Sequence, residues 1–199
     1  MPVDRRDLRR RLFSLATDQG GYFTAAQAKK IGYSYPAQAH HVGAGNWLRI
    51  DRGLFRLAEW VPNVHDDLIR WTLWSRDRAV VSHESALSVH SIGEFESARV
   101  HLTVAPGISI REDPSVVLHH ANLLEGDVIQ RTGFKLTTAI RSLVDIAALS
   151  AEEDQLARAI QEAREGGLLT IRQLRTRAEA LDAKAALYIE RAIQRIETS

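Results

Sequence analysis

Histidines are the residues of this sequence whose type is most typical of metal chemistry, and there are eight of them. His83-Glu84 begins like the zinc motif H-E-x-x-H, but the next histidine is His90, seven positions after the first. A zincin needs the i,i+4 spacing because only then do both imidazoles point at one ion. His119 and His120 are adjacent and would point to opposite faces of a strand. We therefore predict no bound metal, and interpret these histidines as capping, packing or surface residues.

The patterns of other catalytic sites are also missing from the sequence. It contains no cysteine and no G-x-S-x-G segment, which excludes a thiol nucleophile and the usual serine motif. The glycines of Gly43–Gly45 follow a predicted helix, whereas a phosphate-binding loop follows a strand. Acidic residues are scattered between positions 94 and 127, and no spacing fixes a carboxylate pair. We expect neither an enzyme nor a cofactor. A nuclease or transferase acting on nucleic acid remains the alternative.

The first element is predicted to be a helix over residues 4–19. Its apolar side chains fall on one stripe: Leu8, Leu12, Phe13, Leu15 and Ala16. Arginines crowd the rest of its surface: Arg5, Arg6, Arg9, Arg10 and Arg11. This run would either contact DNA phosphates or simply keep the helix solvated.

Two short helices and a hairpin are predicted next. Thr24 and Gln27 form a capping box at the start of the second helix, which Gly32 ends. Ser34 caps the third helix, which runs to about residue 44. Two strand-like arms, 47–50 and 54–57, then flank a turn at Asp51-Arg52-Gly53. Compact helices followed by a hairpin are the order of a winged helix-turn-helix, a DNA-binding unit.

Charge is divided unevenly along the chain. Residues 1–60 contain ten Lys or Arg and five Asp or Glu, for a net charge of +5, whereas residues 61–199 contain sixteen and twenty, for −4. A basic head on an acidic body is typical of a polyanion-binding module attached to a second function. We predict a DNA-binding domain over residues 1–60 and a body over residues 61–199.

The body is predicted to be mixed α/β up to about residue 150 and helical afterwards, which makes the fold class α+β. The pattern of apolar residues predicts helices at 66–76, 84–90 (capped by Ser82) and 139–149 (capped by Thr138), strands at 79–82, 100–104, 116–119, 128–130 and 134–136, and further helices at 152–165, 171–180 and 183–197. Arg141 and Asp145 stand one helical turn apart and are expected to pair.

The remaining bulk features indicate a cytoplasmic protein. The first residues lack the apolar stretch of a secretory signal, and no apolar run approaches the roughly 20 residues that a membrane helix needs. A chain without cysteine is compatible with a reducing compartment.

The head and three later segments together resemble the AbiEi family, antitoxins of bacterial toxin–antitoxin systems linked to abortive infection. The later segments are SHESALSVHSIG (82–93), HLTVAP (101–106) and TTAIRSLVDIA (137–147), so the resemblance covers nearly all of residues 20–150. It implies a winged helix-turn-helix that binds inverted repeats in operator DNA and represses its own operon. It also implies a body that counteracts a cognate nucleotidyltransferase-like toxin.

The third helix departs from this family because it has no Lys or Arg, whereas family members often carry basic residues there. Base reading would fall to the polar residues of that helix: Ser34, Tyr35, Gln38, His40 and His41. Phosphate contacts would come from the first helix and the wing: Arg5, Arg6, Arg9, Arg10, Arg49, Arg52 and Arg56. Weak binding by one head would require two half-sites, and so a dimer on DNA. A ligand-sensing transcriptional regulator is a further possibility.

Overall fold

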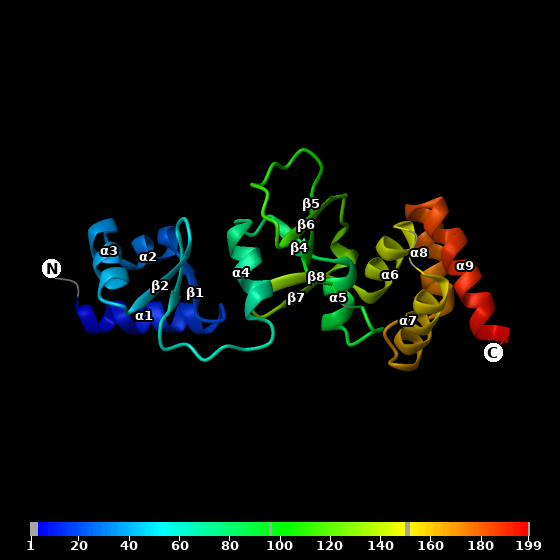
Figure 1. The fold of residues 1–199 in the computed structure, drawn as a ribbon, viewed down its shortest axis with the longest axis horizontal. Helices are drawn as coiled ribbons and strands as arrows, with labels where there is room; N and C mark the ends of the chain where they lie inside the picture. Colours follow the sequence, from blue (N-terminus) through cyan, green and yellow to red (C-terminus); the bar gives the residue numbers. More distant parts are fainter. Residues whose placement is uncertain (1–3, 96, 150–151, 199) are drawn as a thin grey trace. The chain divides into compact units, whose positions relative to one another are not determined.

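The chain folds into two compact units in the computed structural model, which describes residues 4–95, 97–149 and 152–198 (Figure 1). The N-terminal unit extends to Arg78 and includes Arg131–Phe134, and the C-terminal unit comprises Ala79–Gln130 and the residues from Lys135 onward. Helices and small sheets occur in one chain with a helical C-terminal part, so the fold class is α+β, as predicted.

The N-terminal unit is a winged helix-turn-helix with one additional helix. Its elements are α1 (Arg5–Thr17), β1 (Tyr22–Thr24), α2 (Ala25–Ile31), α3 (Tyr35–Gly43), β2 (Trp47–Asp51), β3 (Leu54–Leu57) and α4 (Asp66–Trp74). The strands form an antiparallel sheet in the order β1-β3-β2. The strand β1 was not predicted, because three residues are too few to show a period. Its Phe23 packs in the centre of the core, with ring centroids 4.8 Å from Trp47 and 5.8 Å from Phe55.

Both predicted helix caps of the head are present. The Thr24 hydroxyl accepts from the Gln27 backbone N–H, and the Gln27 side chain accepts from the Thr24 N–H, which completes the capping box. The Ser34 hydroxyl accepts from Ala37 N–H at the start of α3. Local hydrogen bonds of this kind depend on residues three apart, and they fix both helix starts of the helix-turn-helix.

Asp66 ties α4 to the preceding segment. Its Oδ2 accepts from the Trp60 indole N–H at 3.0 Å and from the Asn63 backbone N–H at 2.9 Å. A Cβ atom at Gly20 would lie only 2.6 Å from Asp66 Oδ1, which is too close, so this approach requires glycine. These contacts explain why α4 groups with the N-terminal unit, although it lies beyond the predicted domain boundary at residue 60.

The C-terminal unit combines a five-stranded mixed sheet with helices. Its elements are β4 (Ala79–Val81), α5 (His83–Val89), β5 (Val100–Val104), β6 (Val116–His120), a 3₁₀ turn η1 (Glu125–Asp127), β7 (Val128–Arg131), β8 (Phe134–Thr137), α6 (Ala139–Ala148), α7 (Glu153–Glu165), α8 (Ile171–Leu181) and α9 (Ala183–Thr198). The strand order is β6-β5-β4-β8-β7. Pairing is antiparallel between β4 and β5, and parallel between β5 and β6 and between β4 and β8.

The helices of this unit share one apolar core. The long C-terminal helix α9 packs against α6, α7 and α8 (Figure 1). Fully buried side chains come from each of these helices, among them Leu143, Leu156, Leu174 and Ile189. None of the helices in the described part of the chain is both long and apolar enough to cross a membrane.

A buried ionic cluster joins η1, α6 and α8. Asp127 accepts from Arg141 Nη1 at 3.1 Å and from Arg177 Nη2 at 2.6 Å, and Arg141 Nε donates to Asp145 at 2.8 Å. The side chains of Asp127 and Arg141 are each only 5% exposed. Burial tends to raise the pKa of Asp127, but the hydrogen bonds from Arg177 and from the Leu124 backbone outweigh it and lower the pKa. The expected Arg141–Asp145 pair is thus confirmed as part of a larger cluster.

Replacing the shared carboxylate should strongly destabilise the C-terminal unit. Asp127→Asn keeps the shape but leaves two guanidinium groups without their common counter-charge, so we expect a loss of about 3 kcal/mol in the free energy of unfolding. Urea unfolding followed by far-UV circular dichroism would measure it.

The matched control for this change is Asp154→Asn. Asp154 pairs with Arg195 at 2.7 Å, but both side chains are about half exposed, at 52% and 51%. Water screens such a pair, and its loss should cost no more than about 0.5 kcal/mol. Equal effects of the two substitutions would contradict the role given to Asp127.

Candidate nucleic-acid interface

The exposed start of α3 is the part of the helix-turn-helix that can meet a base edge. Ser34 and Tyr35 are both exposed, and 60% of the Tyr35 surface is accessible to solvent. Lys29, in the last turn of α2, holds its ammonium 4.9 Å from the centre of that ring. Lys30 is also exposed on α2. These two lysines were missing from the predicted interface, although the segment Ala28-Lys29-Lys30 stands only a few residues before α3.

Gln38 was predicted to read bases, and the structure corrects this prediction because the side chain is buried inside the head. The residue is only 3% exposed. Its side-chain amide donates to the backbone carbonyl of Tyr33 at 2.9 Å and to that of Ala25 at 3.1 Å. Helical spacing placed Gln38 on α3 but did not show that this face turns toward α2. Its amide thus joins the two helices instead of facing DNA.

The two adjacent histidines of α3 have different environments. His40 is exposed. His41 is half-buried and stacks on the Trp47 indole, with 4.7 Å between ring centroids and 14° between planes, and its Nδ1 lies 3.2 Å from the Asn46 side-chain nitrogen. Burial, and secondarily the neighbouring His40, lowers the pKa of His41. His41 therefore attaches α3 to the root of the wing, and His40 remains available to a ligand.

The wing presents two of its three arginines outward. Arg52 is exposed in the β2–β3 turn, beside Gly53, whose φ of 73° closes that turn. Arg49 is exposed on β2. Arg56 is different: its guanidinium lies 5.3 Å from the Tyr22 ring centre, and its Nη2 donates to the Trp60 carbonyl at 3.4 Å. The expectation that Arg56 contacts phosphate is therefore corrected, because its side chain packs within the head.

The arginines of α1 are exposed and lie beside α3. Arg5 and Arg9 line a cleft of about 680 Å³ together with Ser34, His40 and His41, over a floor that includes Leu12, Tyr33 and Trp47. Arg6 and Arg10 are exposed on the same helix, and Arg10 pairs with Asp7 at 2.7 Å. Of the residues predicted to contact DNA, those of α1 and α3 that line this cleft lie together, whereas Arg49 and Arg52 lie on the wing.

These features define the class of the N-terminal unit. Paired short helices, an exposed start of the second of them, and a hairpin with outward arginines form a winged helix-turn-helix of the kind that transcriptional regulators use. Residues 10–58 match the family model described as "Transcriptional regulator, AbiEi antitoxin". This match runs from within α1 to just past the wing, so this segment is similar to AbiEi-type regulator domains, which agrees with the resemblance seen in the sequence of the head.

A solved structure shares the fold more widely. The chain is similar to the crystal structure of the RV2827C protein from Mycobacterium tuberculosis, with a TM-score of 0.61 and 13% sequence identity. The similarity covers 94% of this chain and 77% of that one. At this identity the likeness concerns the fold alone. Among curated proteins, no sequence matched this chain.

The position of Gln38 predicts an effect on stability. Gln38→Ala would leave the carbonyls of Tyr33 and Ala25 without their buried donor, which should lower the free energy of unfolding of the N-terminal unit by about 1–3 kcal/mol. Tryptophan fluorescence can report this, because all four tryptophans (Trp47, Trp60, Trp71 and Trp74) belong to that unit.

Tyr35→Ala is the matched control on the same helix, since it removes an exposed side chain and should change stability by less than about 0.5 kcal/mol. If both variants unfolded at the same urea concentration as the unmodified protein, the structural role of Gln38 would be wrong.

Proposed function

We propose that this chain is a non-enzymatic antitoxin and autorepressor that acts in the cytoplasm. Its N-terminal unit binds inverted repeats in the operator of its own operon, and its C-terminal unit counteracts a nucleotidyltransferase-like toxin encoded beside it. The observation that carries this proposal is the AbiEi-type winged helix-turn-helix at residues 10–58 with its exposed cationic groups.

The charge of the head supports binding to DNA. Arg49 and Arg52 are exposed on the wing, an element whose cations commonly contact the sugar–phosphate backbone, and Arg5 and Arg9 line one cleft with residues of α3. Neutralising phosphates in this way releases counterions and makes affinity fall steeply as salt rises. The recognition helix itself contributes no formal charge, so binding depends on its neighbours.

The small number of exposed polar groups on α3 supports binding as a pair of heads. With Gln38 buried and His41 packed on Trp47, base reading rests on Ser34, Tyr35 and His40. Three such groups discriminate few base pairs, and each mismatched base pair typically costs about 1–3 kcal/mol. Two heads on an inverted repeat make twice as many base contacts, and helix-turn-helix proteins commonly bind two half-sites as dimers.

The exposed wing arginine predicts a salt-dependent loss of affinity. Arg52→Ala should weaken binding to the upstream DNA of its own gene and to random duplex by a similar factor. The slope of log affinity against log salt should fall by about one unit, because one phosphate contact is lost. Fluorescence anisotropy with labelled duplexes over a salt series would measure both quantities.

Arg56→Gln is the matched control because this arginine is on the same hairpin but packs on Tyr22. The folded variant should keep the salt slope of the unmodified protein. Mobility shifts that show no preference of the unmodified protein for its own upstream DNA over random duplex would overturn the repressor half of the proposal.

The antitoxin half of the proposal predicts that a variant with weakened DNA binding still neutralises the toxin. Cells that co-express the neighbouring toxin with the full-length Arg52→Ala variant should still grow, whereas repression of a promoter reporter should weaken. The growth rate and the reporter signal give the two readouts. Growth arrest despite normal levels of the unmodified chain would contradict the antitoxin assignment, and toxin-independent cleavage of nucleic acid would favour the enzyme alternative.

A further inference from the structure

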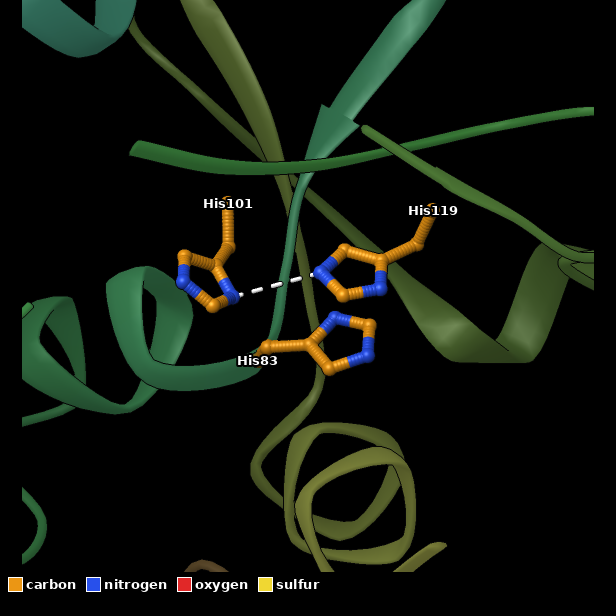
Figure 2. Close-up of side chains that lie close together, drawn as sticks. All are labelled: His83, His101 and His119. Carbon is orange, nitrogen blue, oxygen red and sulfur yellow. Dashed lines mark hydrogen bonds between the residues drawn. The ribbon is translucent and has the colours of Figure 1, made fainter. Parts of the chain in front are cut away.

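Three histidines that lie far apart in the sequence meet on the sheet of the C-terminal unit. His83 is the first residue of α5, directly after β4, while His101 lies on β5 and His119 on β6. These three strands are neighbours in the sheet order β6-β5-β4. Figure 2 shows the imidazole rings turning toward one another from these separate segments, and one ring nitrogen of each lies within 4.8 Å of the others.

The register of the strands explains how two of these rings share a face. His119 pairs directly with Thr103 in the parallel β5–β6 ladder. Thr103 and His101 are two residues apart on β5, so their side chains lie on the same face. His101 and His119 are therefore diagonal neighbours, and Nδ1 of the first lies 3.2 Å from Nε2 of the second.

The distance between these two nitrogens is that of a hydrogen bond between the rings, and it is also close to the spacing of two ligands of one metal ion. Two ligands about 2.05 Å from a tetrahedral zinc ion lie about 3.3 Å from each other. His101 and His119 have this spacing already. His83 stacks on His119 with 3.6 Å between ring centroids and 15° between ring planes. Its nearest nitrogen is within 4.8 Å of its partners, and the ring would have to turn out of the stack for this nitrogen to reach the tetrahedral spacing.

A hydroxyl and a carboxylate orient the His101 ring in the way that metal-binding histidines are oriented. The outer nitrogen of His101, Nε2, lies 3.2 Å from the Ser97 hydroxyl and 3.5 Å from the Glu84 carboxylate, which leaves Nδ1 facing the cluster. A carboxylate or hydroxyl behind a histidine orients the ring and raises its basicity toward a metal. His83 Nδ1 lies 2.9 Å from the Ser82 hydroxyl, which accepts from Thr103 at 2.8 Å. In Figure 2 this is the His83 nitrogen drawn nearer the other two rings, so a metal bound there would replace the contact with Ser82.

Burial keeps these imidazoles neutral and thus able to donate a lone pair. His83 and His101 are 5% and 8% exposed. Burial first, and the neighbouring histidines second, lower the pKa of His83 to about 2 and that of His119 to about 4. His83 also has a φ of 53°, a left-handed conformation that is uncommon for a residue other than glycine and that often marks a functional position.

The charges nearby also permit a cation. The Arg141 guanidinium acts electrostatically on His83, and the carboxylates of Asp127 and Asp145 offset its charge. Glu84 adds a carboxylate on the other side, beside His101. His119 is only half-buried, and the Glu84 side chain is 34% exposed, so an ion can reach the cluster from solvent.

We propose that His83, His101 and His119 bind one divalent transition-metal ion, with zinc the best match, and leave a fourth position for water or another ligand. Imidazole nitrogen suits zinc and its neighbours, whereas magnesium and calcium require oxygen ligands. Three histidines with one open position are the ligand set of a reactive zinc rather than of a closed structural site. The proposal is independent of DNA binding, because the three histidines belong to the C-terminal unit.

Calorimetry on the tag-free, chelator-treated full-length protein tests the site. Titration with Zn²⁺ should give one ion per chain, and Co²⁺ should give the visible absorption bands of a tetrahedral site, while Mg²⁺ should give neither. His101→Ala and His119→Ala should abolish this stoichiometric binding. Glu84→Gln should weaken it by about 10- to 100-fold, because it removes the group behind His101.

The matched control is His120→Ala, which removes the exposed histidine next to His119 and should leave zinc binding unchanged. Circular dichroism identifies variants that have lost their fold, and His119→Gln replaces His119→Ala if the latter does not fold. If folded His119 variants bind zinc as tightly as His120→Ala, or if the unmodified protein binds no ion stoichiometrically, the three histidines serve only packing and the proposal fails.

Discussion

The C-terminal unit depends on one carboxylate that two arginines share. Asp127 ends a 3₁₀ turn before β7, and its partners Arg141 and Arg177 come from α6 and α8. Burying a guanidinium is costly unless its charge and its donors are satisfied, so these contacts fix α6 and α8 to the turn that precedes β7. The charge of Arg141 also acts on His83, and its pairing with Asp127 and Asp145 reduces its repulsion of a cation at the histidine cluster.

In the N-terminal unit, several polar side chains make contacts within the head, and only the others are available to a ligand. Gln38 donates to the backbone at the start of α2 and in the turn before α3, and His41 stacks on Trp47. Arg56 similarly covers Tyr22. These three contacts stabilise the geometry of α3 and the wing. The exposed cations that surround α3 are left to provide affinity, and the start of α3 is left to provide whatever sequence preference the head has.

Local rules predicted the elements of this fold well, but not the contacts between them. The cap of α2 by Thr24 and Gln27 and the Arg141–Asp145 pair join residues three or four apart, so the spacing alone is sufficient. Ser82 shows the limit of such rules. It precedes α5 as predicted, but its hydroxyl makes no capping bond and instead contacts His83 and Thr103. The Thr103 contact arises from the pairing of β4 with β5, and no sequence period reveals it.

The histidines illustrate the same limit, because their chemistry follows from environment rather than from spacing. His119 and His120 point to opposite faces of β6, as the strand period requires, yet only the sheet order places His119 beside His101. A motif search finds metal ligands that one helix presents, and it misses ligands that two adjacent strands and the start of a helix bring together. Exposed His40, with its ring open to solvent beside cationic Arg9, suits contact with an anion. Buried His83, held neutral among imidazoles, suits a cation. If both proposals hold, the two units use one residue type for ligands of opposite charge.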